Sequence, residues 1–523
     1  MSAMPATSAA PASSVTRNLS TRYLAIVAEM AVGLLVLPFN VAHLGKAAYG
    51  LWVLTTSITA YFSVLDLGYS GALVKFVAQY RAKRDFRSLN EILSTTYYLF
   101  VIFGVVTYLI AIVIAVFLGR ILSIGPDQLH VARVVLLVTS VNFALATAFS
   151  IFGAVINGFQ RYDINNITGT ISSVIVAVVN VVVLALGYGL VELVVATTAV
   201  KVLTYWVYRA NAYRVYRGLD LRPANFRRHR LREVTSFSVY MMLIDWANKM
   251  NYSIDTIVIG VMLGTAAVAV WAIAQRLAEV TQRLTNQLND ILFPTVVDHS
   301  ESSRIASLQS IFLVGTRLSL ATVIPIGMVL ILMADQLVQA WVGPEFSGSV
   351  IILQLLSLTV MIRIGNATAQ TLLKGADHHK LVAYTNVISA LVNLALSIVL
   401  ARWMGLAGVA IGTLVPISIS SIFVLFPAGC RRVELPLGRA FADAVWPAIW
   451  PAAAMAAYIA LTRPFVPVSL LPVLLNMGVA AGVYVAVFVT FAINATERRF
   501  YITKAFEAVP LTRTLFAGVV GQA

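Results

Sequence analysis

Twelve charged side chains lie inside long apolar stretches of this sequence, and their chemistry needs the most explanation. If those stretches cross a membrane, each charge at mid-bilayer costs about 2.5–3.5 kcal/mol on insertion scales. Twelve charges facing lipid would cost on the order of 30 kcal/mol, more than the stability of about 5–15 kcal/mol of a typical domain. Most of them must therefore face protein or water. They are Glu29, Asp66, Lys201, Asp245, Lys249, Asp255, Arg276, Glu279, Arg283, Asp290, Arg317 and Arg363.

The densest group of polar side chains lies on one face of a helix predicted over 266–293. On a wheel of 100° per residue, six of them fall within an arc of about 100°. These six are Arg276, Glu279, Arg283, Asn286, Gln287 and Asp290. In the preceding predicted helix, over 236–262, the residues that share a face are Asp245, Lys249, Tyr252 and Thr256. Two consecutive helices with polar stripes predict a hydrated cavity inside the membrane.

Internal ion pairs explain part of this pattern. Asp245–Lys249 has i,i+4 spacing and Arg276–Glu279 has i,i+3 spacing, and both spacings bring side chains together on a helix. Arg283, Arg317 and Arg363 have no acid at such a spacing on their own helices. Spare cations in a cavity favour an anionic ligand, and a planar guanidinium binds phosphate through two hydrogen bonds. A pyrophosphate group fits this set.

The intramembrane acids have two interpretations. They neutralise the cations, or they take up H⁺ or Na⁺ and couple an ion gradient to transport. The acids concerned are Glu29, Asp66, Asp245, Asp255, Glu279 and Asp290. We expect no metal site and no other cofactor, because Cys430 is the only cysteine and the six histidines are scattered.

The composition indicates which elements must position these residues. The chain of 523 residues is 59% hydrophobic and 11% charged, whereas soluble chains are about 45–50% apolar and about 25% charged. We predict an all-α polytopic membrane protein with about fourteen helices, since a span takes about 20 residues. The predicted helices are 22–43, 49–71, 92–118, 131–156, 166–187, 190–211, 236–262, 266–293, 307–333, 349–373, 381–402, 407–428, 444–462 and 469–493. The predicted helix 444–462 has Trp446, Pro447 and Pro451 at its start. If such a segment broken by prolines does not cross the membrane, the count is twelve or thirteen spans.

The basic residues predict the orientation. With the N-terminus in the cytoplasm, 26 of the 37 Lys and Arg residues fall in inside segments, five at outside edges and six within spans. This bias places both termini in the cytoplasm. It also explains the net charge of +15 without nucleic acid, which we do not expect as a partner. No connection exceeds about 24 residues (212–235), so there is no room for a catalytic domain, and we do not expect an enzyme.

Parts of the sequence repeat. Leu44–Trp52 (LGKAAYGLW) and Leu263–Trp271 (LGTAAVAVW) are 219 residues apart, and Gly158 and Gly375 are 217 apart. Gly189 and Gly405 are 216 apart, at matching outside turns. Six helices per repeat give both repeats the same topology. The predicted parts are a disordered N-terminus (1–16), an N-lobe (17–211), a basic linker (212–235), a C-lobe (236–430), and two further helices with a cytoplasmic tail (431–523).

Residues Pro38–Lys75, PFNVAHLGKAAYGLWVLTTSITAYFSVLDLGYSGALVK, strongly resemble the start of Wzx-type polysaccharide-export flippases. That family belongs to the multidrug/oligosaccharidyl-lipid/polysaccharide exporter superfamily. The LG-x-x-x-YGLW turn, LDLGYSGALVK, the KGADHHK turn and WMGLAGVAIGT (Trp403–Thr413) carry the resemblance, which covers about residues 20–430.

The resemblance implies a V-shaped bundle of two six-helix lobes around a cavity. It implies alternating access that carries an undecaprenyl-pyrophosphate-linked oligosaccharide to the outer leaflet of the bacterial inner membrane, for exopolysaccharide or lipopolysaccharide. The expected partners are this lipid-linked oligosaccharide, membrane lipids, and a polysaccharide polymerase with its chain-length machinery. The pyrophosphate-binding role is carried over to Lys249, Arg276, Arg283, Arg317 and Arg363.

Three other functions agree less well with these residues. An ion-coupled drug or cation exporter of the same superfamily would have a cavity dominated by acids, which the spare arginines disfavour. A membrane polymerase would carry catalytic residues on a large outside loop, which the sequence lacks. A scaffold without transport would gain nothing from the polar stripe.

Overall fold

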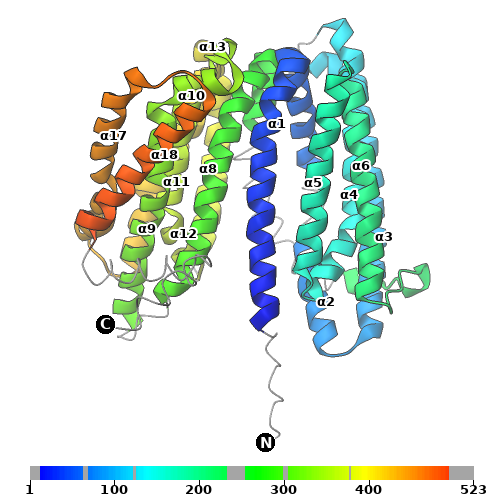
Figure 1. Cartoon of the computed structure of the whole chain (residues 1–523). Helices are drawn as coiled ribbons and strands as arrows, with labels where there is room; N and C mark the ends of the chain where they lie inside the picture. The colour runs from blue at the N-terminus through cyan, green and yellow to red at the C-terminus, as the bar shows by residue number, and fades with distance from the viewer. Residues whose placement is uncertain are drawn as a thin grey trace, which may run out of the picture. The chain divides into compact units, whose positions relative to one another are not determined.

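The structure is a computed structural model that describes residues 12–62, 69–121, 125–231, 254–297, 304–375 and 379–493. Over these residues the chain is helical and contains no strand (Figure 1). Within this described part, nine helices are long and apolar enough to cross a membrane. A tenth is added if Ser349–Gly365 and Ala367–Lys374, which are bent by 41° at their break, form one span. The prediction of an all-α polytopic membrane protein is confirmed.

The described helices are compatible with fourteen predicted spans, and that number stays a prediction. Two of the nine candidates each cover two predicted helices: α1 (Ala12–Tyr61) is broken at Gly45, and Lys380–Arg432 is broken at Gly405 within α13 (His379–Ser418). α8 (Thr265–Val297) carries the polar stripe and is not among the nine. The segment with Trp446 and its neighbouring prolines belongs to Leu437–Phe465, which is long and apolar enough to cross.

Glycines at the helix breaks support the sequence repeat. Gly45 (φ 74°) and Gly264 (φ 84°) are equivalent in the two LG motifs, and both adopt the left-handed conformation that disfavours other residues. Gly405 has φ 58°, and its partner by conformation is Gly187 (φ 83°) rather than Gly189 (φ −93°). The second pair of turns therefore aligns two residues away from the predicted match.

The chain divides into two compact units. The first unit contains the residues up to Ala272 together with Leu396–Val409, and the second contains Ile273–Ala395 and the residues from Ala410 onward. The division falls inside α8 and differs from the predicted lobe boundaries. Residues 254–262 pack on α1 in the first unit, because Gly260 lets Leu54 approach its backbone. The boundaries of the two repeats stay a prediction.

The first unit is built around α4 (Pro126–Gly158), which contacts the five helices α1, α2, α3, α5 and α6. Its apolar core lies where α2, α3, α4 and the end of α6 meet, and includes Phe76, Leu93, Phe152 and Tyr216. Its other helices are α2 (Tyr69–Ala82), α3 (Phe86–Ile121), α5 (Tyr162–Ala185) and α6 (Leu190–Val215).

The basic connection after α6 is fastened to α3 in the first unit. Asn90 Nδ2 donates to the carbonyl oxygen of Gly218 at 2.8 Å, and Ser94 Oγ donates to that of Asp220 at 2.9 Å. Tyr98 Oη donates to the carbonyl oxygen of Leu221 at 3.0 Å. The described part of the predicted linker is thus a packed segment, which includes a 3₁₀ turn at Pro223–Asn225.

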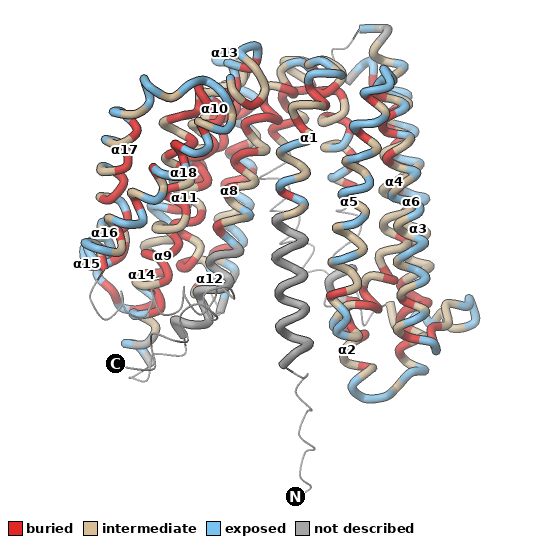
Figure 2. Tube along the Cα trace, in the orientation of Figure 1, coloured by how far each residue is buried: buried red, intermediate tan, exposed pale blue. Residues whose placement is uncertain are grey.

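The second unit is organised around α9 (Arg304–Leu332), which contacts most of its other helices and is buried over much of its length (Figure 2). Buried residues near one end of α9, among them Phe312, Ala369, Cys430 and Val433, form an apolar cluster. Its other helices include α10 (Ala334–Val342), α11 (Ser349–Gly365), α12 (Ala367–Gly375), α14 (Phe426–Arg432), α15 (Leu437–Ala440), α16 (Trp446–Ile449), α17 (Pro451–Thr462) and α18 (Leu470–Val487). Three π-helical segments, η4 (Ile419–Leu425), η5 (Phe441–Val445) and η7 (Phe488–Ala492), lie between or after them.

Candidate functional site

The predicted polar stripe lies on α8, in its part within the second unit. Arg276 Nη1 lies 4.0 Å from Glu279 Oε2, and these side chains are 30% and 33% exposed. Gln275 Nε2 also donates to Glu279 Oε1 at 3.0 Å. The predicted i,i+3 pair is therefore present, but it is long and about a third exposed. Such pairs stabilise a protein by about 0–1 kcal/mol.

Arg283 lies one turn further along α8 and is exposed. Among the described residues its guanidinium has no hydrogen bond or ion pair. The other face of α8 is packed, because Thr281 and Thr285 are buried and their hydroxyls donate to carbonyl oxygens of the same helix at 3.0 and 2.8 Å. A cationic face and a packed face thus divide the helix, as the wheel predicted.

The other predicted cations are placed differently. Arg317 on α9 is 9% exposed, and its Nη1 donates to the carbonyl oxygen of Asp443 at 3.5 Å. That position fixes η5 against α9. Arg363 lies half-buried in the last turn of α11, just before the bend to α12. The structure does not bring Arg317 to an exposed face, and its predicted substrate contact stays a prediction. Lys249 and Asp245 lie outside the described residues.

Among the predicted acids, Asp255 is the most buried in the described part of the chain, at 3% exposure. Its Oδ1 accepts a hydrogen bond from Ser397 Oγ at 3.2 Å, and that hydroxyl also lies 3.4 Å from the carbonyl oxygen of Val409. All three residues belong to the first unit. Glu29 is exposed on α1. Asp66 and the side chain of Asp290 lie outside the described part.

A cavity of about 240 Å³ in the first unit contains the remaining intramembrane cation, Lys201. Its polar lining comes from threonines and Asn142 on α1, α4 and α6, and no hydrogen bond or ion pair of the Lys201 ammonium is found among the described residues. The hydroxyls that line it include those of Thr56, Thr59, Thr139, Thr197 and Thr198. The sequence identified Lys201 as a charge within a span but not as part of a site, because its threonine neighbours come from three separate helices.

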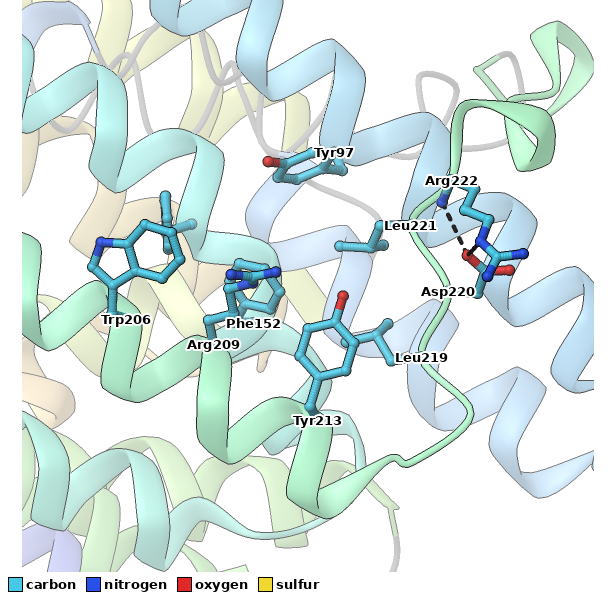
Figure 3. A pocket seen from close by; sticks show the side chains of 10 residues that line it. Tyr97, Phe152, Trp206, Arg209, Tyr213, Leu219, Asp220, Leu221 and Arg222 are labelled. Atoms are coloured by element: carbon cyan, nitrogen blue, oxygen red, sulfur yellow. Dashed lines mark hydrogen bonds and ion pairs between the residues drawn. The ribbon is translucent and has the colours of Figure 1, made fainter.

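A second cavity of the first unit, of about 560 Å³, lies between α3, α4, α6 and the segment after α6. Figure 3 shows Arg209 between Trp206 and Tyr213, with Tyr97 and Leu221 opposite. The Arg209 guanidinium carbon lies 5.1 Å from the ring centre of Trp206 and 5.6 Å from that of Tyr213. In the sequence, Arg209 contributed only to the predicted orientation. The i, i+3 and i+7 spacing of these three residues was the signal that could have identified the site.

Charges anchor the segment that closes this second cavity. Arg230 Nη2 lies 3.2 Å from Glu91 Oε2 on α3, and it also donates to Ser88 Oγ at 2.7 Å. In the same region, the pKa of Asp85 lies below its usual range because its carboxylate accepts hydrogen bonds from Ser88. Burial raises the pKa of Tyr216. No group of three His, Cys, Asp or Glu residues is arranged to hold a metal within the described ranges.

Comparisons with known sequences identify a protein family and two relatives. A family profile described as "Polysaccharide biosynthesis protein" matches residues 43–351. The "Probable flippase AglR" of Haloferax volcanii is 22% identical over 405 residues, which cover 76% of this chain and 80% of the relative. The "Uncharacterized membrane protein EpsK" of Bacillus subtilis is 29% identical over 141 residues, 27% of this chain and 28% of the relative.

Solved structures show the same fold. The "Lipid II flippase MurJ, inward closed conformation" superposes with a TM-score of 0.70 at 14% identity, covering 90% of this chain and 98% of that chain. An inward-facing multidrug resistance MATE family transporter of the MOP superfamily has a TM-score of 0.62 at 15% identity, covering 80% and 98%. The resemblance to Wzx-type flippases, predicted from Pro38–Lys75, is confirmed by the family profile and the flippase relative, and the solved structures share the fold.

Proposed function

The chain belongs to the polysaccharide biosynthesis protein family, and from this premise we propose that it flips an undecaprenyl-pyrophosphate-linked oligosaccharide from the inner to the outer leaflet. The coarser function is that of a multi-pass membrane flippase in polysaccharide biosynthesis, which the family and its flippase relative support. The pyrophosphate and the direction of transport are the finer part of the proposal.

The cationic face of α8 is the observation that carries the proposal. Arg276 and Arg283 lie about two turns apart on this face, and among the described residues only Arg276 has an acidic partner, Glu279 at 4.0 Å. A pyrophosphate brings at least two negative charges and several acceptor oxygens. An acid-dominated face would favour a cationic drug instead, so this pair of arginines favours the lipid-linked oligosaccharide.

The binding step follows from the strengths of the interactions. The Arg276–Glu279 pair contributes about 0–1 kcal/mol because it is partly exposed. A hydrogen bond between a guanidinium and a phosphate oxygen contributes about 1.5–3 kcal/mol, and a guanidinium can form two. The pyrophosphate therefore displaces Glu279 from Arg276, while Arg283 neutralises the second phosphate group.

We propose that Asp255 binds the coupling cation. Its carboxylate, the Ser397 hydroxyl and the Val409 carbonyl oxygen lie close together in a buried position. Oxygen ligands of this kind suit a hard cation such as Na⁺, and an intramembrane carboxylate can also take up H⁺. One turn earlier on the same face of α13, Asn393 is fully buried, and neither polar atom of its amide has a partner within the described part. A bound cation near this face would satisfy the amide oxygen of Asn393.

Reconstituted protein tests the proposed function. In vesicles that contain a fluorescent undecaprenyl-pyrophosphate-linked oligosaccharide, the label should become accessible to an outside reagent only when the protein is present. A matched vesicle set with a fluorescent phospholipid measures non-selective scrambling. Equal rates for both lipids, or no flipping of either under any ion gradient, would overturn the proposal.

A further inference from the structure

The aromatic cavity around Arg209 has a chemistry that the proposed transport site does not explain. Five aromatic rings line it, from α3, α4 and α6: Tyr97, Phe149, Phe152, Trp206 and Tyr213. Their rings contact one another at centroid distances from 5.5 Å (Phe149–Phe152) to 6.4 Å (Tyr97–Phe152). The aromatic part of the wall is therefore well packed, and the Arg209 guanidinium lies against it (Figure 3).

The N–H groups of the Arg209 guanidinium are available to a ligand. Within the described residues it has no hydrogen bond or ion pair, and its recorded contacts are with the faces of Trp206 and Tyr213. The other charges at the cavity neutralise each other, because Arg222 Nε lies 3.6 Å from Asp220 Oδ1. One uncompensated guanidinium with five N–H donors remains in an aromatic cavity.

The position of the cavity indicates the source of a ligand. Leu203, Trp206 and Val207 on α6 are exposed apolar residues, the type of surface that faces lipid tails. Trp206 belongs both to this surface and to the cavity. On the other side, the cavity is closed by the basic segment after α6. Arg209 is six residues from the end of α6, about 9 Å along the helix axis, and the ends of membrane-spanning helices lie near the lipid head groups.

We propose that this cavity binds the phosphate of a membrane lipid, with Arg209 as the phosphate ligand and the aromatic rings against the first carbons of the lipid. The proposal is independent of the substrate flipped and of the α8 site. A glycerophospholipid and a polyprenyl phosphate both present this chemistry, and the experiment separates them.

Native mass spectrometry of the detergent-purified full chain measures bound lipid directly. The probes are a phosphatidic acid, undecaprenyl phosphate, and a diacylglycerol that lacks phosphate. The test variant is Arg209→Ala. The matched control is Arg214→Ala, which removes the same charge from an exposed position on α6 outside the cavity. Arg209→Lys tests whether a cation alone suffices.

Arg209→Ala should weaken binding of at least one phosphate lipid by about tenfold or more, whereas Arg214→Ala leaves it unchanged. If Arg209→Ala loses binding of both phosphate lipids, the cavity is a general head-group site. If it loses binding of undecaprenyl phosphate alone, the cavity is an isoprenoid site. Both outcomes support the proposal. Equal affinities in the wild type and Arg209→Ala, equal losses in both alanine variants, or an equal loss of diacylglycerol would overturn it. A thermal unfolding midpoint of Arg209→Ala close to that of the wild type excludes misfolding as the cause.

Discussion

The Ser397 hydroxyl donates a hydrogen bond to the Asp255 carboxylate at 3.2 Å, although the two residues are 142 positions apart in the sequence. A buried carboxylate needs compensation, since an unpaired charge is costly in an apolar interior. The Ser397 hydroxyl supplies one such interaction, and it also lies 3.4 Å from the carbonyl oxygen of Val409. These buried oxygen atoms are the group to which we assign the coupling cation.

Replacing Asp255 by Asn should remove the dependence of transport on the ion gradient. The amide keeps the shape and the hydrogen bond to Ser397, but it loses the charge that would hold the cation. In flipping assays with Na⁺ or H⁺ gradients of either direction, the variant should give one slow rate under all conditions. Glu434→Gln, an exposed acid of the second unit, is the control. A variant at Asp255 that still responds fully to a gradient would exclude it as the coupling site.

Glu91 should anchor the basic segment after α6. Its carboxylate oxygens lie 3.5, 3.8 and 3.2 Å from guanidinium nitrogens of Arg87, Arg227 and Arg230. Glu91→Gln removes the carboxylate that pairs with the half-buried Arg230, and we expect a loss of about 2 kcal/mol in unfolding free energy and faster proteolysis after α6. Arg87→Ala removes an 86% exposed partner and should cost no more than about 0.5 kcal/mol. Equal effects of the two substitutions would show that Glu91 has no anchoring role.

Gly50 allows α1 to contact the start of α8. A Cβ at this position would overlap the backbone carbonyl of Thr265, and backbone cannot move aside as a side chain can. Gly50→Leu should abolish accumulation of folded protein, measured by size-exclusion chromatography in detergent. Gly482 on α18 has nothing within 4 Å of such a Cβ, so Gly482→Ala should be neutral or stabilise by up to about 1 kcal/mol. Normal folding of Gly50→Leu would contradict this packing.

Lys201 should lower the stability of the protein. Its charge lies within a span without a counter-ion in the described structure, and such a charge costs about 2.5–3.5 kcal/mol at mid-bilayer. Lys201→Met should therefore raise the thermal unfolding midpoint. A midpoint of this variant at or below that of the wild type would contradict this cost.

Local patterns in the sequence predicted much of this fold. The apolar runs identified the spans, and the LG motifs identified the turns at Gly45 and Gly264 because only a few residues tolerate a positive φ. The polar face of α8 was also predictable, since the spacing of residues along a single helix determines which side chains share a face. The wheel could not show that Arg317 is buried against Asp443, because that contact joins segments 126 residues apart.

The same limit applies to the cavities. Arg209 contributed only to the predicted orientation, because basic residues near the end of a span usually mark its cytoplasmic side. Its aromatic neighbours Tyr97 and Phe152 come from α3 and α4, so only the folded chain shows that they surround it. Ser397 was missed for the same reason, since a serine within a span has no distinctive sequence signal.

The most direct test is the flipping rate of the Arg276→Ala, Arg283→Ala double variant in vesicles with the lipid-linked oligosaccharide. Both guanidinium groups are partly or largely exposed, so the variant should fold and insert normally, as judged by chromatography and thermal unfolding. We expect the rate to fall by about a hundredfold or more, because at least two charge-assisted hydrogen bonds of about 1.5–3 kcal/mol each are lost. Arg439→Ala, which removes an exposed arginine paired with Asp443 at 3.3 Å, should retain the wild-type rate. A double variant that flips within about twofold of the wild type would contradict the assignment of the α8 face to the pyrophosphate.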